Sequence, residues 1–181
     1  MRLYYRAKIA LFARFLGPEA IAVVLYHSLF PWYVLELGGA KLGRHVRVQG
    51  SLLLHECGGS FATLTVGDRV HIGKGVLIDL SSPVTIGNRV TIAMYSRILT
   101  HQNVGDSALA KAYPPITGPL CIPDDVVLGV GCTLLFPTKL TAGTFVAAGA
   151  VVRGHHPESV LLAGVPARCV RKLGPGGVQL T

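Results

Sequence analysis

The fold is decided by residues 122–152, which read IPDDVVLGVGCTLLFPTKLTAGTFVAAGAVV. An aliphatic residue recurs there at every sixth position, namely Ile122, Leu128, Leu134, Leu140, Val146 and Val152. This period matches neither the α-helix, with about 3.6 residues per turn, nor the β-strand, with a repeat of about two. A sustained six-residue period instead predicts a repeat architecture.

The same period runs through much of the chain upstream. It appears in three shorter runs, which are Leu42, Val48 and Leu54, then Val66, Ile72 and Ile78, then Ile86, Ile92 and Ile98. A small or β-branched residue often lies four positions after the aliphatic residue, and glycine or another small residue often follows it directly. The pattern therefore covers well over half of the sequence.

A six-residue unit has room for one short strand and one tight turn, and three units close a triangular coil of about 18 residues. The aliphatic side chains point into the coil and stack on their equivalents in the coils above and below. Adjacent coils lie at strand spacing and form parallel hydrogen bonds. The sequence thus predicts an all-β fold, a parallel β-helix of hexapeptide repeats.

The segments outside the repeat divide the chain into three parts. We expect an N-terminal helical segment at residues 1–41, the β-helix at residues 42–153 and a C-terminal tail or cap at residues 154–181. The step from Ile98 to Ile122 is 24 residues instead of six, so residues 104–120 are expected to leave the coil as a protruding loop. Long loops within compact domains are usually functional.

Composition limits the functional classes. The chain has 181 residues, half of them hydrophobic and 14% charged, which excludes intrinsic disorder. The net charge of +8 favours an anionic partner, such as a phosphorylated cofactor, an acidic glycan or an anionic membrane surface. No nucleic-acid partner is expected, because the basic residues are scattered and no recognition motif accompanies them.

The cysteines indicate the redox setting. Cys57, Cys121, Cys132 and Cys169 stand far apart and form no CxxC pair, which argues against a disulfide framework and against a structural zinc site. Free thiols favour a reducing cytoplasmic location. No metal ligand set is predicted.

Three features carry a resemblance to a known family. They are Ile98-Leu99-Thr100-His101 with the loop that follows, the repeats from Ile122 onward, and the ending AGVPARCVRKL at residues 163–173. With them the sequence resembles the hexapeptide-repeat acyltransferases, in particular the maltose, galactoside and xenobiotic O-acetyltransferase branch, and resembles polysaccharide-biosynthesis O-acetyltransferases among them. The resemblance implies a left-handed coil and a homotrimer that binds acetyl-CoA in the grooves between subunits.

The resemblance also implies the site residues. His101 matches the family's catalytic histidine, and a neutral imidazole suits the removal of a proton from a hydroxyl. Backbone N–H groups at the turns are expected to bind the thioester and the pantetheine arm, at Gly129, Val130, Ala147, Ala148 and Gly149. Cations are expected to meet the phosphorylated end of CoA, at Arg153, Arg168 and Arg171, since guanidinium groups suit phosphate.

The expected function is therefore an acetyl-CoA-dependent O-acetyltransferase that acts on a hydroxyl of a sugar or polysaccharide precursor. Two alternatives stay open, an N-acyltransferase for an amino sugar and a non-catalytic β-helix that serves as a scaffold subunit. The N-terminal segment mixes Tyr4, Tyr5, Phe12, Phe15 and Trp32 with Arg2, Arg6, Lys8 and Arg14. That mixture suggests peripheral contact with the inner face of a membrane.

Overall fold

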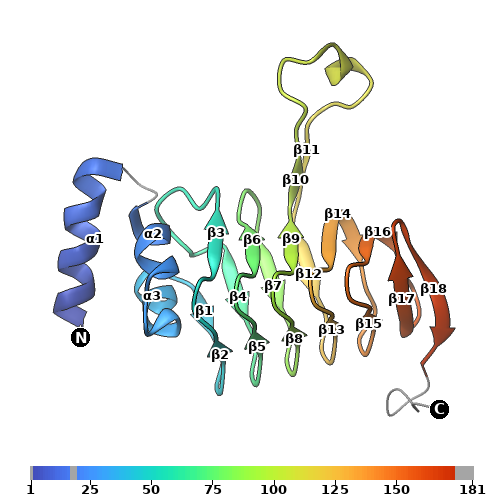
Figure 1. Cartoon of the computed structure of the whole chain (residues 1–181), viewed down its shortest axis with the longest axis horizontal. Helices are drawn as coiled ribbons and strands as arrows, with labels where there is room; N and C mark the ends of the chain where they lie inside the picture. Colours follow the sequence, from blue (N-terminus) through green and yellow to red (C-terminus); the bar gives the residue numbers. More distant parts are fainter. Residues whose placement is uncertain (1, 17–19, 174–181) are drawn as a thin grey trace.

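The computed structural model describes residues 2–16 and 20–173, which form three helices followed by a long coil of short strands (Figure 1). The helices are α1 (Arg2–Leu16), α2 (Ala20–Tyr26) and α3 (Pro31–Leu37). They cover the first coil and share its core, because Leu25 and Leu35 are fully buried in one cluster with Phe61. The part of the expected C-terminal segment at residues 174–181 lies outside the described residues.

The coil has three sides, each a sheet of strands from successive coils that run parallel, except for the last strand of the chain, which is antiparallel. Sheet A contains β1 (Lys41–Leu42), β4 (Leu64–Val66), β7 (Val84–Ile86) and β12 (Leu120–Ile122). Sheet B contains β2 (Arg47–Val48), β5 (His71–Ile72), β8 (Thr91–Ile92), β13 (Val127–Leu128), β15 (Phe145–Val146), β17 (Val160–Gly164) and β18 (Ala167–Lys172). Sheet C contains β3 (Leu53–His55), β6 (Leu77–Asp79), β9 (Arg97–Leu99), β14 (Thr133–Lys139) and β16 (Val151–His155).

The strand register confirms the predicted stacking. Ile72 pairs with Val48 below it and Ile92 above it, and the same column continues to Leu128 and Val146. The aliphatic residues of these columns form the core, and most of their side chains are completely buried. The prediction of a parallel β-helix of hexapeptide repeats is therefore confirmed.

The coil ends later than the sequence boundary at residue 153. β17 pairs in parallel with β15 and adds one more strand to sheet B, and β18 then folds back antiparallel on β17. The boundary was wrong because Leu162 follows its partner Val146 by only 16 residues, which breaks the six-residue spacing without breaking the stack.

The protruding loop also differs from its expected bounds. It begins with a two-stranded antiparallel ribbon, in which β10 (His101–Gln102) pairs with β11 (Ile116–Thr117), and a short 3-10 helix (Ala108–Lys111) lies near its tip (Figure 1). Leu120, which was expected in the loop, is buried and pairs with Val84 in sheet A. The excursion therefore covers residues 101–119.

The turns that lengthen the coil all lie at one edge of the prism. Turns from sheet A to sheet B and from sheet B to sheet C keep four residues, as at 87–90 and 93–96. The turns from sheet C to sheet A comprise residues 56–63, 80–83 and 100–119 in successive coils. Two of them are longer than four residues, and around residues 80–83 the step from Ile78 to Ile86 is eight residues instead of six. We call this the histidine edge, and the turns from sheet B to sheet C (residues 49–52, 73–76, 93–96, 129–132 and 147–150) the glycine edge.

Gly129→Ala is expected to destabilise the coil. A Cβ at Gly129 would lie 2.6 Å from the backbone nitrogen of Ala148 and 2.7 Å from the carbonyl oxygen of Val146, and backbone cannot move aside easily. Overpacking of this kind costs about 1–3 kcal/mol, or roughly 2–4 °C of melting temperature per kcal/mol in a chain of this size. Gly50→Ala is the matched control, because a Cβ there meets nothing within 4 Å. Equal melting temperatures for the two variants would contradict the close approach of the coils.

Candidate active site

The candidate site is built around His101, where the chain leaves sheet C for the protruding ribbon. Its side chain is one-third exposed. Asp79, at the end of β6 in the coil below, is completely buried. The Nδ1 atom of His101 lies 2.7 Å from the Oδ2 atom of Asp79. A carboxylate inside the coil thus orients an imidazole at its surface.

The buried carboxylate of Asp79 is satisfied by neighbouring donors. The N–H and hydroxyl groups of Thr100 donate to its Oδ2 atom at 2.8 and 2.7 Å, and the N–H of His101 donates to the same atom at 3.1 Å. The hydroxyl and N–H of Ser81 donate to Oδ1 at 2.6 and 3.0 Å. Burial alone would raise the pKa of Asp79, but these hydrogen bonds outweigh it and hold the pKa well below the usual range.

The ionised carboxylate fixes the tautomer of His101. An ionised Asp79 can only accept hydrogen bonds, so the short contact requires the hydrogen of the imidazole to reside on Nδ1. Nε2 then carries a free lone pair, and within the described part of the chain nothing hydrogen-bonds to it. His101 is therefore arranged to accept a proton from a bound molecule.

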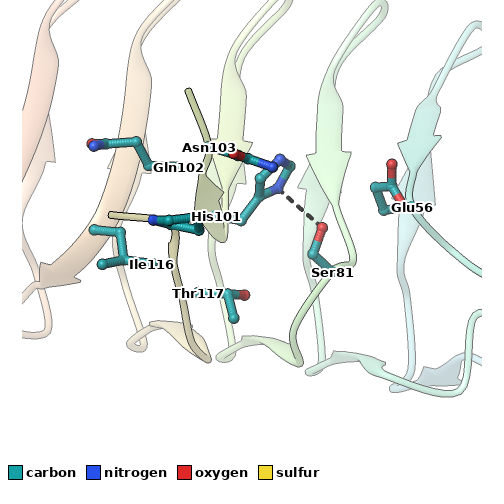
Figure 2. Close-up of a pocket in the computed structure, with 8 residues that line it drawn as sticks. Glu56, Ser81, His101, Gln102, Asn103, Ile116 and Thr117 are labelled. Carbon is teal, nitrogen blue, oxygen red and sulfur yellow. Dashed lines mark hydrogen bonds between the residues drawn. The ribbon is translucent and has the colours of Figure 1, made fainter. Parts of the chain in front are cut away.

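A pocket of about 350 Å³ lies beside this imidazole, large enough for a small ligand. It is lined by Glu56, Ser81, His101, Gln102, Asn103, Pro115, Ile116 and Thr117. Figure 2 shows Ser81 facing His101, with Glu56 on one side of them and Gln102 and Ile116 on the other. The lining combines one carboxylate with hydroxyl and amide groups and exposes more apolar than polar surface, so it suits a ligand with both hydrogen-bonding groups and apolar faces.

The five turn residues predicted to bind the cofactor all lie on the glycine edge, but they are not equivalent. The N–H groups of Gly129, Ala147 and Gly149 each donate to a carbonyl oxygen of a neighbouring coil at 2.8 Å. Those of Val130 and Ala148 donate to no protein acceptor among the described residues. Both residues are exposed and lie one coil apart, so these two N–H groups alone of the five are free for a ligand.

The predicted cationic residues divide between the two edges. Arg168 pairs with Ala163 next to the glycine edge, and Arg171 pairs with Leu161 further along the same ribbon; both arginines are exposed. Arg153 instead lies near the pocket, where its Nη1 atom donates to the Oε1 atom of Gln102 at 3.4 Å. Arg153 is thus separated from the other predicted cofactor residues.

A single prism does not bring His101 and the predicted cofactor residues together. His101 lies on the histidine edge, between sheets C and A, whereas Val130 and Ala148 lie on the glycine edge, between sheets B and C. Figure 1 shows the β10–β11 ribbon on one side of the coil and the turns after β13 and β15 on the other. His101 and these free N–H groups could therefore meet one ligand only across two copies of the chain.

Sequence reasoning missed Asp79, Ser81 and Glu56. The available signal for the first two was the eight-residue step from Ile78 to Ile86, which lengthens one turn and places a carboxylate directly after an inward-pointing residue. Across residues 2–16 and 20–173, no three His, Cys, Asp or Glu side chains gather closely enough to hold a metal ion.

Comparison with known proteins identifies relatives that match most of the chain. No protein-family model matches the sequence. The putative lipopolysaccharide biosynthesis O-acetyl transferase WbbJ of Escherichia coli is 30% identical over 156 residues, which are 79% of this chain and 76% of that protein. A serine acetyltransferase of Mycobacterium tuberculosis is 27% identical over 169 residues, 89% of this chain and 69% of that protein.

A solved structure agrees in both fold and sequence. The hexapeptide-repeat acetyltransferase of Vibrio cholerae O1 biovar eltor, solved in complex with acetyl coenzyme A, superposes with a TM-score of 0.75 and 28% identity. The match covers 91% of this chain and 88% of that one. With the identity to WbbJ across most of both sequences, these likenesses establish that the chain belongs to the hexapeptide-repeat acetyltransferases and is an acyltransferase.

Proposed function

We propose that the protein transfers an acetyl group from acetyl-CoA to a hydroxyl of a sugar or polysaccharide precursor, with His101 as the general base. The observation that carries the proposal is the 2.7 Å contact between Nδ1 of His101 and the ionised, buried Asp79, which leaves Nε2 free to accept a proton. The relatives support the donor and the acceptor class, since one is described as an O-acetyl transferase and another was solved with acetyl coenzyme A.

The chemistry follows from this geometry. Nε2 of His101 removes the proton of the acceptor hydroxyl as its oxygen bonds to the thioester carbonyl carbon. The C–S bond then breaks, the acetyl ester forms, and the imidazolium returns the proton to the CoA thiolate. The carboxylate of Asp79 stabilises the imidazolium between these two steps and holds the ring in place.

Cofactor binding forms a second part of the proposal. The free N–H groups of Val130 and Ala148 are suited to the carbonyl oxygens of the pantetheine arm or the thioester, and Arg168 and Arg171 to the phosphates. Because these groups lie on the glycine edge, we propose a cyclic homotrimer in which the glycine edge of one subunit faces the histidine edge of the next. The left hand of the coil, implied by the family resemblance, belongs to the same proposal.

The test of the proposed function is direct. Purified protein is incubated with acetyl-CoA and a panel of p-nitrophenyl glycosides and free amino sugars, and CoA release is followed with a thiol reagent. We expect CoA release that depends on a hydroxyl acceptor, with a mass gain of one acetyl group on that acceptor. Transfer to amines alone would favour the N-acyltransferase, and failure to bind CoA in calorimetry would favour the scaffold.

We also propose that α1 contacts an anionic membrane surface at the cytoplasmic face. Leu3, Leu11 and Phe15 lie one or two helical turns apart and are 83%, 60% and 75% exposed, and residues 2–16 contain basic but no acidic residues. Tyr5, by contrast, is buried and is not available to a membrane. No helix within the described ranges is long and apolar enough to cross a bilayer, so the contact would be peripheral.

Co-sedimentation with vesicles tests this contact on the full-length chain. Wild-type protein is expected to pellet with phosphatidylglycerol vesicles more than with phosphatidylcholine vesicles, because basic residues are attracted to anionic lipid. Replacing Leu11 and Phe15 by glutamate is expected to abolish pelleting without changing the melting temperature, since both side chains are exposed. Equal pelleting of variant and wild type would contradict the proposal.

A further inference from the structure

Glu56 occupies the wall of the pocket opposite the ribbon that carries His101 (Figure 2). It comes from the first turn of the histidine edge, residues 56–63, whereas Ser81 and His101 come from the next two. Three successive coils therefore each contribute one turn of the histidine edge to a single pocket. None of the short turns at the other edges contributes to its lining.

The carboxylate of Glu56 is accessible to a ligand in the pocket. Its side chain is 61% exposed, and within the described residues its ionisable partner is His55, whose Nε2 atom lies 3.6 Å away. An exposed pair at this distance contributes little to stability. No lysine or arginine lines the pocket in the described part of the chain, so no fixed cation neutralises the carboxylate there.

The remaining lining indicates which donors the carboxylate would receive. Ser81, Thr117, Gln102 and Asn103 provide hydroxyl and amide groups, while Pro115 and Ile116 provide apolar surface. A sugar ring presents hydroxyl groups along its rim and C–H groups on its faces, so it matches both parts of this lining. A carboxylate can accept two hydrogen bonds from adjacent hydroxyls, and bonds to a charged group are among the stronger ones.

We infer that Glu56 is an acceptor-binding residue that accepts hydrogen bonds from hydroxyls of a neutral carbohydrate next to the hydroxyl that reacts at His101. The inference rests on the proposed acetyl transfer and adds to it the residue that selects and orients the acceptor. The geometry separates two roles: His101 takes the proton, and Glu56 sets which hydroxyl lies beside it.

Steady-state kinetics of the full-length enzyme test the assignment. With acetyl-CoA and the best p-nitrophenyl glycoside of the panel, Glu56→Gln and Glu56→Ala are expected to lower acceptor kcat/KM by about 10- to 100-fold, as for loss of a hydrogen bond to a charged group. The KM for acetyl-CoA and the slow hydrolysis of acetyl-CoA without acceptor should not change. Glu158→Gln is the matched control, since Glu158 is an exposed carboxylate that pairs with Lys172 away from the pocket.

Deoxy glycosides, each lacking one hydroxyl, provide a second test. A purely structural role of Glu56 would not make its effect depend on which hydroxyl is missing. Wild-type enzyme should lose activity on the one deoxy glycoside that lacks the hydroxyl bound by Glu56, and Glu56→Ala should show no further loss on that same compound. If both enzymes respond equally to every deoxy glycoside while wild type still transfers acetyl groups, the inference is wrong and the proposed function stands. If wild type acetylates no hydroxyl acceptor, the proposed function fails and this inference with it.

Discussion

His101→Gln is expected to lower kcat by about 10²- to 10⁴-fold, the usual contribution of a general base. Glutamine can hydrogen-bond in the space of the imidazole but cannot take up the proton of the acceptor hydroxyl. The melting temperature should change little, because the His101 side chain is one-third exposed and a glutamine amide can still donate a hydrogen bond to Asp79. The measurement is CoA release at saturating acetyl-CoA and acceptor.

The control for this prediction is the neighbouring histidine. The ring of His55 lies 6.3 Å from the ring of His101, measured between centroids, but His55 has no buried carboxylate behind it. His55→Gln is therefore expected to retain kcat within a few-fold of wild type. Unchanged turnover in His101→Gln, with acetyl transfer intact in the wild type, would remove His101 from the mechanism.

Asp79→Asn is expected to cause a loss of similar size, about 10²- to 10⁴-fold in kcat, although Asp79 touches neither substrate. An asparagine amide can donate a hydrogen bond to Nδ1, which would move the imidazole hydrogen to Nε2 and remove the free lone pair. Ser81→Ala is the matched variant, because it removes a hydrogen bond to the same carboxylate but leaves its charge. We expect it to lose far less activity than Asp79→Asn.

The same carboxylate predicts a dependence of stability on pH. The pKa of Asp79 is lower in the folded protein than in the unfolded chain. The ionised carboxylate therefore stabilises the fold above about pH 4, and this stabilisation is lost progressively as the pH falls below that value. Urea unfolding at pH 7 and pH 3 should show a larger loss in wild type than in Asp79→Asn. An equal loss in the two proteins would contradict a depressed pKa at this position.

The periodicity of the sequence was sufficient to predict the coil, because each aliphatic residue at a six-residue spacing has only one inward position to occupy. It failed where the spacing changes without a change in stacking. Leu162 stacks on Val146 after 16 residues, and Leu120 returns to sheet A just before the register of Ile122 resumes. Both errors have the same cause. Strand pairing depends on hydrogen bonds to neighbouring coils, and the spacing of residues along the sequence gives no information about those bonds.

The site was predictable only in part for a related reason. His101 could be placed by its motif, but its partner Asp79 is 22 residues earlier and becomes its neighbour only through the length of one coil with a lengthened turn. From the sequence, the turn residues Gly129 and Val130 were equally good candidates for cofactor contacts. Their difference, one N–H bonded to Val146 and the other free, follows from the register of the coils.

The most direct test of the central claim is complementation between two inactive variants. His101→Gln lacks the base, and Ala148→Trp is expected to block the glycine edge, because Ala148 is exposed beside the free N–H groups. The two chains are co-expressed with different tags and the mixed assemblies are purified through both. A site shared between neighbouring subunits predicts that each variant alone is inactive, while every mixed cyclic trimer keeps one intact site of three and so restores about one third of wild-type turnover. Mixed assemblies that contain both chains but release no CoA would show that the base and the cofactor edge act within one chain, contrary to this account.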